Sequence, residues 1–186
     1  MIASLVLAVA ILSAAGCSRV EPKPSPAEDK KGYGMGGVEQ QIAILAEVVD
    51  DKPAPWNLDT PEAAVRSYLD WVSYAYRVAE SDVASATQSP HQVVRTDAYV
   101  QANLQEERLL DQVLTSITFG SASIEGTRAA LPAQEQWSYR YVSITEAGKT
   151  IGGPYAASYE TTYTLVKGDG GWVVDGIEVK ALGEVK

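Results

Sequence analysis

The chain has 186 residues, of which 46% are hydrophobic and 21% charged, and its formal net charge is −9. This composition is typical of a globular domain, and the length favours one domain with an attached tail. An acidic chain without clustered Lys or Arg is unsuited to nucleic acid or to electrostatic binding of anionic lipid. With one Cys and one His, neither an intramolecular disulfide nor a Cys/His zinc site can form. We therefore expect no metal, no cofactor and no nucleic-acid partner.

Residues 1–16 have the features of an export signal. The run from Ile2 to Gly16 is apolar and uncharged, and it is shorter than the roughly 20 residues that a membrane-spanning helix needs. Its end, Ala14-Ala15-Gly16-Cys17, resembles the lipobox of bacterial lipoproteins. Position 14 departs from that pattern, since it holds Ala in place of the preferred Leu, and no basic residue precedes the run.

The resemblance to the lipobox implies a lipoprotein signal peptide over residues 1–16. In that family the thiol at the position of Cys17 is joined to diacylglycerol, so acyl chains such as palmitate hold the protein on the membrane. We therefore expect an extracytoplasmic protein, anchored to the cell membrane or, in a diderm host, to the outer membrane. The alternative is a buried N-terminal helix with an incidental Cys.

Residues 17–54 are predicted to form the lipidated Cys and a mostly disordered tether. Residues 18–37 are rich in Pro, Gly and charged side chains and show no apolar periodicity. The stretch from Ile42 to Val49 is apolar again, and its pattern fits either an edge strand or a short helix packed on the domain.

The domain expected over residues 55–186 opens with helical signals. Thr60 is a good N-cap and Pro61 suits the first helical position. Apolar side chains then recur at three- and four-residue spacing, giving one buried face: Ala64, Tyr68, Trp71, Val72, Ala75 and Val78. On the same helix, Arg66 and Asp70 are four residues apart and predict an exposed ion pair.

Two further helices are predicted before the pattern changes. A short one covers residues 81–87, and a third covers residues 91–106, with Val94, Ala98, Leu104 and Tyr99 expected to face inward. From about residue 113 the period becomes that of strands, over residues 113–125, 133–144, 155–167 and 171–182. The segments between them are rich in Gly and suit turns.

Helices followed by a run of antiparallel strands predict an α+β domain, with helices packed on one face of a curved sheet of about four strands. This order resembles the cone-shaped superfamily of nuclear transport factor 2 and ketosteroid isomerase, over roughly Asp59 to Leu182. The most specific part is the expected C-terminal hairpin, Y-E-T-T-Y-T-L-V-K-G-D-G-G-W-V-V-D. The resemblance implies a cone-like fold and leaves the function open, because this superfamily contains both enzymes and binding modules.

Enzymes of that superfamily use a carboxylate base and polar donors inside the cone. Glu135 is the best candidate for the base because it alternates onto the same face as Trp137 and Tyr139, and Asp175 is the second. Tyr139 and Tyr163 would then donate hydrogen bonds to a ligand. The alternative is that Glu135 is solvated or paired with an arginine and that the tyrosines belong to the core, so no catalytic residue is assigned.

The aromatic residues favour a binding site over a catalytic one. The chain has ten Tyr and four Trp against one Phe, and such amphipathic rings suit a pocket or a partly wet interface. The strip expected to bind a ligand or partner consists of Trp137, Tyr139, Tyr141, Tyr159 and Tyr163. The sequence therefore predicts a non-catalytic binding module at the cell envelope. Its partner would be an envelope protein, a glycan, a small apolar ligand or a second copy pairing through the sheet face. The competing prediction is an isomerase or dehydratase that uses a cavity carboxylate.

Overall fold

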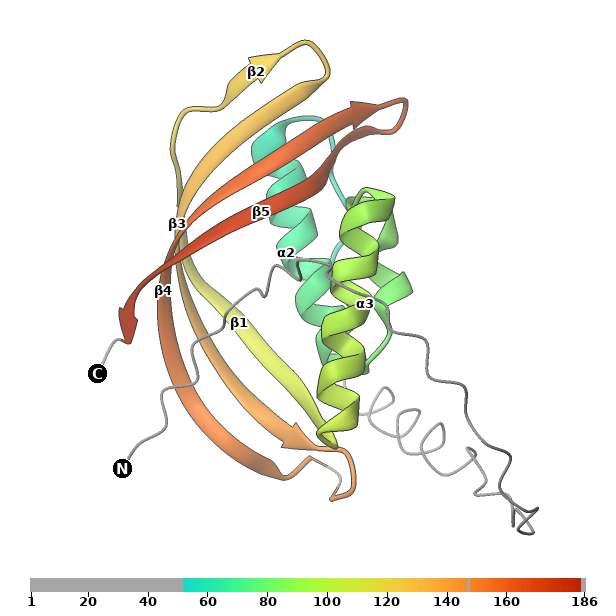
Figure 1. The fold of residues 1–186 in the computed structure, drawn as a ribbon, viewed down its shortest axis with the longest axis vertical. Coiled ribbons are helices and arrows are strands. Elements are labelled where there is room, and N and C mark those ends of the chain that lie inside the picture. Colours follow the sequence, from blue (N-terminus) through green and yellow to red (C-terminus); the bar gives the residue numbers. More distant parts are fainter. Residues whose placement is uncertain (1–51, 147, 185–186) are drawn as a thin grey trace, which may run out of the picture. The chain divides into compact units, whose positions relative to one another are not determined.

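The structure is a computed structural model that describes residues 52–146 and 148–184. Within these residues, two α-helices and one 3-10 helix pack against one face of a curved antiparallel sheet of five strands (Figure 1). The predicted α+β class and the order of helices before strands are confirmed. The predicted signal peptide, Cys17 and the apolar stretch 42–49 lie outside the described residues.

Helix α2 (Pro61–Val78) forms as its sequence predicts. The Thr60 hydroxyl accepts a hydrogen bond from the Ala63 N–H at 3.2 Å, which caps the first turn. All six apolar residues predicted to share a face are buried. The helix ends at Ala79, whose backbone adopts the left-handed conformation (φ 57°) and donates its N–H to the Ala75 carbonyl.

The 3-10 helix η1 (Ser81–Thr87) is followed by α3 (Pro90–Gln105). Both elements were predicted, but the predicted inward face of α3 is wrong at Val94 and Ala98, which are exposed. Tyr99 does turn inward, and its ring centroid lies 4.8 Å from that of Tyr76. Val94 is 68% exposed, and the residues that α3 buries are Gln92, Thr96, Val100 and Asn103. The buried face of α3 is polar because its side chains find hydrogen-bond partners on other elements, which an apolar periodicity cannot reveal.

The strands are β1 (Arg108–Phe119), β2 (Ser123–Glu125), β3 (Arg128–Ser143), β4 (Thr150–Gly168) and β5 (Gly171–Glu184). Their order in the sheet is β1-β3-β4-β5, with β2 paired to β3. The segment predicted as one strand over residues 113–125 is two strands, and β1 starts earlier, at Arg108. Leu109 and Leu110 are both buried, so the start of β1 lacks the alternation that marks a half-buried strand.

The two faces of the sheet differ in what covers them. The inner face packs on α2 and holds the core residues Leu131, Tyr163, Leu165 and Val174. Along β3, residues from Arg128 to Gln136 alternate between exposed and buried, so every second side chain points to the other face. No helix or strand of the described residues lies on that outer face (Figure 1). None of the described helices is long and apolar enough to cross a membrane.

Candidate functional site

Glu135 lies on the inner face of β3, in the middle of the sheet. Its side chain is 5% exposed. The Tyr163 hydroxyl on β4 donates to Oε1 at 2.5 Å, and the Trp137 indole N–H, two residues along β3, donates to Oε2 at 2.8 Å. The structure thus joins the predicted base with two residues of the predicted aromatic strip, and both carboxylate oxygens have a donor.

The charge of this carboxylate affects the tyrosines around it. Glu135 forms no ion pair with a described residue. Burial, followed by the charge of Glu135 and the hydrogen bond to it, raises the pKa of Tyr163 well above 10. Burial also raises the pKa of Tyr68 to about 12. The Tyr68 ring meets that of Tyr163 edge-on, with 6.3 Å between centroids, and its hydroxyl accepts from the Gln92 side chain at 3.0 Å.

A polar network therefore runs from the sheet to the helices through the core. Glu135 is hydrogen-bonded to Tyr163, the ring of Tyr163 packs on that of Tyr68, and the hydroxyl of Tyr68 is hydrogen-bonded to Gln92 on α3. Beside it, the Thr96 hydroxyl donates to the side-chain oxygen of Gln88 at 2.5 Å. Such a network fixes the position of α3 on the sheet, because each buried polar group would be costly without its partner.

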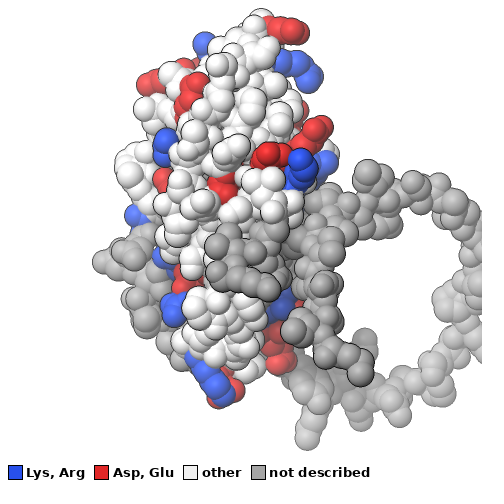
Figure 2. All heavy atoms as spheres, turned by 90° about the vertical axis from the view of Figure 1, so that its left-hand side faces the viewer, with Lys and Arg blue, Asp and Glu red and all other residues white. Residues whose placement is uncertain are grey.

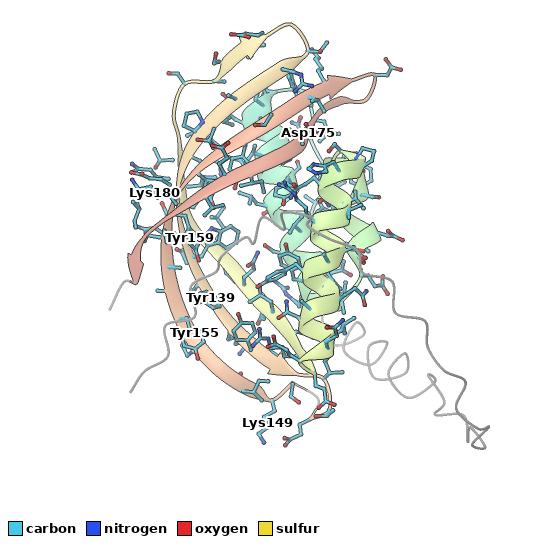
Figure 3. The ribbon with its side chains drawn as sticks, viewed as in Figure 1. Tyr139, Lys149, Tyr155, Tyr159, Asp175 and Lys180 are labelled. Carbon is cyan, nitrogen blue, oxygen red and sulfur yellow. The ribbon has the colours of Figure 1, made fainter. Side chains whose placement is uncertain are left out.

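Asp175 occupies a different kind of position. It is half-buried in β5 (Figure 3), at a point where the pairing with β4 shifts register, from Leu165 opposite Val174 to Thr164 opposite Gly176. Asp175 is the extra residue of this β-bulge. The structure does not bring Asp175 and Glu135 into contact with one another, so the two candidate carboxylates do not form an acid–base pair.

The predicted aromatic strip divides into a buried part and a part that reaches the surface. Trp137 and Tyr163 are core residues, at 8% and 1% exposure, which leaves them no surface for a partner. Tyr139, Tyr141 and Tyr159 are half-buried and lie on the same face of the sheet. Figure 3 shows Tyr139 and Tyr159 on the curved lower half of the sheet, together with Tyr155.

Two residues that are outside the predicted strip, Tyr155 and Arg108, extend it. Tyr155 is 47% exposed, and its ring centroid lies 5.2 Å from that of Tyr139. The guanidinium of Arg108 stacks over the Tyr141 ring at 4.0 Å. Tyr155 could have been found from its alternation with Tyr159, whereas the contact of Arg108 depends on the register between β1 and β3.

The outer face of the sheet contains a trough with a volume of about 700 Å³. It runs across the strands between two rows of side chains. The rows are about 7 Å apart, because side chains on the same face of a strand come from every second residue. One row is Thr118, Gln134, Glu160 and Lys180, and the other includes Pro132, Thr162 and Glu178. Lys180 and Glu160 form an ion pair at 3.0 Å.

This outer face is largely uncharged, with scattered Lys, Arg, Asp and Glu (Figure 2). The side chains around the trough are neutral on β1 and β3, and the charged ones are Glu160 on β4 and Glu178 and Lys180 on β5. Neither Glu135 nor Asp175 lines the trough. The sequence prediction of a binding surface named only residues of the inner face, because aromatic side chains were its signal.

The chain can also be compared with known proteins. No family model matches it, and no curated protein matches its sequence significantly. Among solved structures, the intermembrane space region of chloroplast protein ARC6 is similar, with 17% identity and a TM-score of 0.57 over 69% of this chain and 99% of that one. This likeness shows the fold alone.

Two further structures are less similar. A putative calcium/calmodulin dependent protein kinase II association domain from Xanthomonas campestris has 14% identity and a TM-score of 0.45, over 74% of this chain and 100% of that one. An NTF-2-like protein of unknown function from Shewanella oneidensis has 12% identity and a TM-score of 0.39, over 64% of this chain and 98% of that one. At these scores no conclusion beyond a distant likeness follows, and membership of the cone superfamily stays a prediction.

Proposed function

We propose that this protein is a lipid-anchored envelope lipoprotein whose domain is a non-catalytic binding module, and that it binds through the outer face of its sheet. The observation that carries the proposal is the uncovered face with its trough of about 700 Å³. A sheet face that no described element covers is available to a partner, and standard interfaces need only about 800 Å² from each partner.

The inner carboxylate supports a non-catalytic role. A general base must lie within hydrogen-bond reach of the substrate proton. Glu135 is 5% exposed, and its two oxygens are directed at the hydroxyl of Tyr163 and the indole N–H of Trp137, which are themselves core residues. In this arrangement Glu135 is a structural residue that orders the core, and the isomerase or dehydratase alternative is disfavoured.

The partner that we propose is a second copy of the chain, paired through the outer faces. The neutral side chains around Gln134 and Thr162 suit such a contact, because a two-fold axis would place like side chains near one another and like charges there would repel. Glu178 and Lys180 would lie towards the β5 side of the contact, and Glu160, which is opposite Gln134 on β4, would enter it as an ion pair with Lys180.

The interface is tested by placing a photo-reactive amino acid at position 134 in the full-length protein in membranes. Cross-linking to a second copy is expected, and Gln134→Arg should weaken the dimer at least tenfold in sedimentation. Val94→Arg is the matched control, because Val94 is exposed on α3, away from the outer face. A cross-link to a different protein would support a binding module at this face but refute a second copy as its partner. The absence of any cross-link from this face would refute the proposal.

The membrane anchor has its own test. Cys17→Ser removes the thiol that would carry the lipid, so incorporation of a labelled palmitate analogue and recovery in the membrane fraction should both be lost. Labelling that persists in Cys17→Ser would contradict the lipoprotein assignment.

A further inference from the structure

A second hollow lies between helix α2 and the edge of the sheet formed by β1. Its volume is about 450 Å³, which is within the range of small-molecule sites. Its walls are one face of α2 and the middle of β1, and Pro53 and Ala54 close one side. We refer to this hollow as the β1 groove; its lining residues include Arg66, Asp70, Ser73, Arg77, Gln112 and Val113.

The strand in this groove has a free edge. Among the described strands, β1 pairs only with β3, so the backbone N–H and C=O groups on its other side have no strand partner there. Val113, in the middle of β1, is 56% exposed. An edge of this kind can accept hydrogen bonds from, and donate them to, an extended peptide.

Asp70 provides an acceptor for a positive group in the groove. It makes no hydrogen bond or ion pair with any described residue, and the ion pair with Arg66 that the sequence predicts is absent. Partial burial raises the pKa of this carboxyl, and the charge of Arg66 acts in the opposite direction. Arg66 itself stacks over the Phe119 ring at 5.0 Å.

Arg77 provides a donor for a negative group. Its Nε lies 3.2 Å from Asp111 on β1, and a guanidinium has five N–H donors, so one such contact leaves donors for a second carboxylate. Asp111 does not line the groove and is shared between Arg77 and Arg140, whose Nε lies 2.7 Å from it. The lining itself carries two guanidinium groups, Arg66 and Arg77, and one carboxylate, Asp70. Both signs of charge are therefore present along the groove, and a ligand with a charge of each sign can meet both.

We propose that the β1 groove binds a short peptide of about three residues with free termini. Asp70 and Arg77 are seven residues apart on α2, which is about 10 Å along a helix, and three extended residues span about the same distance. The peptide ammonium lies at Asp70, its carboxylate at Arg77, and its backbone follows the free edge of β1. This site is separate from the outer sheet face and does not depend on what binds there.

The test is calorimetric titration of the full-length protein in detergent with trialanine, using trialanine blocked at both ends as the control ligand. We expect a Kd of about 1 mM for trialanine, since few groups contribute. Asp70→Asn and Arg77→Gln should each weaken binding about tenfold by removing one charge-assisted contact. Blocking both ends should abolish binding.

Asp82→Asn is the matched control, because Asp82 is an exposed acid on η1, outside the groove. It should bind trialanine as the natural protein does. Backbone amide shifts of Val113 and Leu114 on titration would place the peptide at the β1 edge. The proposal is overturned if trialanine at about 10 mM does not bind, if blocked trialanine binds equally well, or if Asp70→Asn has no effect while circular dichroism shows the fold intact.

Discussion

Replacing Tyr163 with Phe tests whether the buried carboxylate is a structural element of the core. The change removes one hydroxyl and keeps the ring, which is 1% exposed and packs against Tyr68. Glu135 Oε1 loses the donor that lies 2.5 Å away, and Oε2 keeps the Trp137 N–H. A carboxylate oxygen left without a donor in the core cannot regain one from water, so the native state bears the whole loss.

The expected cost follows from the kind of bond that is lost. A hydrogen bond to a charged group contributes about 1.5–3 kcal/mol, so the free energy of unfolding should fall by about 2–3 kcal/mol. For a domain of this size the melting temperature should fall by about 6–12 °C. Urea unfolding at neutral pH, followed by far-ultraviolet circular dichroism, measures the change directly.

Tyr159→Phe is the matched control for this prediction. Tyr159 lies on the same strand and the same face, is half-buried, and its hydroxyl has no hydrogen bond to a described residue. Its substitution should change the free energy of unfolding by less than about 0.5 kcal/mol. If Tyr163→Phe costs no more than Tyr159→Phe, Glu135 does not depend on its tyrosine partner and the structural role assigned to it is refuted.

Three other predictions concern pH, the helix cap and a turn. Burial raises the pKa of Tyr68 and Tyr99 to about 12, so between about pH 10 and 12 only the unfolded state loses these protons. As the pH rises through this range, the free energy of unfolding should fall by about 1.4 kcal/mol per pH unit for each of the two tyrosines. A urea midpoint that does not change over this range would contradict the prediction. Thr60→Ala removes the α2 cap and should cost about 1 kcal/mol in thermal unfolding, with Thr60→Ser restoring most of it. Gly171→Ala should cost more than about 2 kcal/mol in urea unfolding, because φ is 114° and the new Cβ would lie 2.5 Å from the Leu58 carbonyl oxygen; an unchanged midpoint would contradict the observed turn.

The sequence determined the parts of the fold that depend on local patterns. The face of α2 follows from the spacing of residues such as Tyr68 and Val72, and its start follows from Thr60 and Pro61. The strands β3 and β4 follow from alternation, and β5 follows from the Gly-rich turn before it, although β3 and β4 each begin five residues earlier than predicted, at Arg128 and Thr150. These features can be predicted from the sequence because backbone geometry alone places residues three or four apart on one face of a helix, and residues two apart on one face of a strand.

The tertiary structure decided which of those faces meet and what they enclose. Glu135 and Tyr163 are 28 residues apart, and only the register of β3 with β4 brings the carboxylate to the hydroxyl. The inward face of α3 could not be predicted, because Gln92 and Thr96 are buried through hydrogen bonds to other elements and not through hydrophobicity. The outer trough and the β1 groove likewise exist only once the strand order is set, since a sheet acquires a free edge and an uncovered face by what packs beside it.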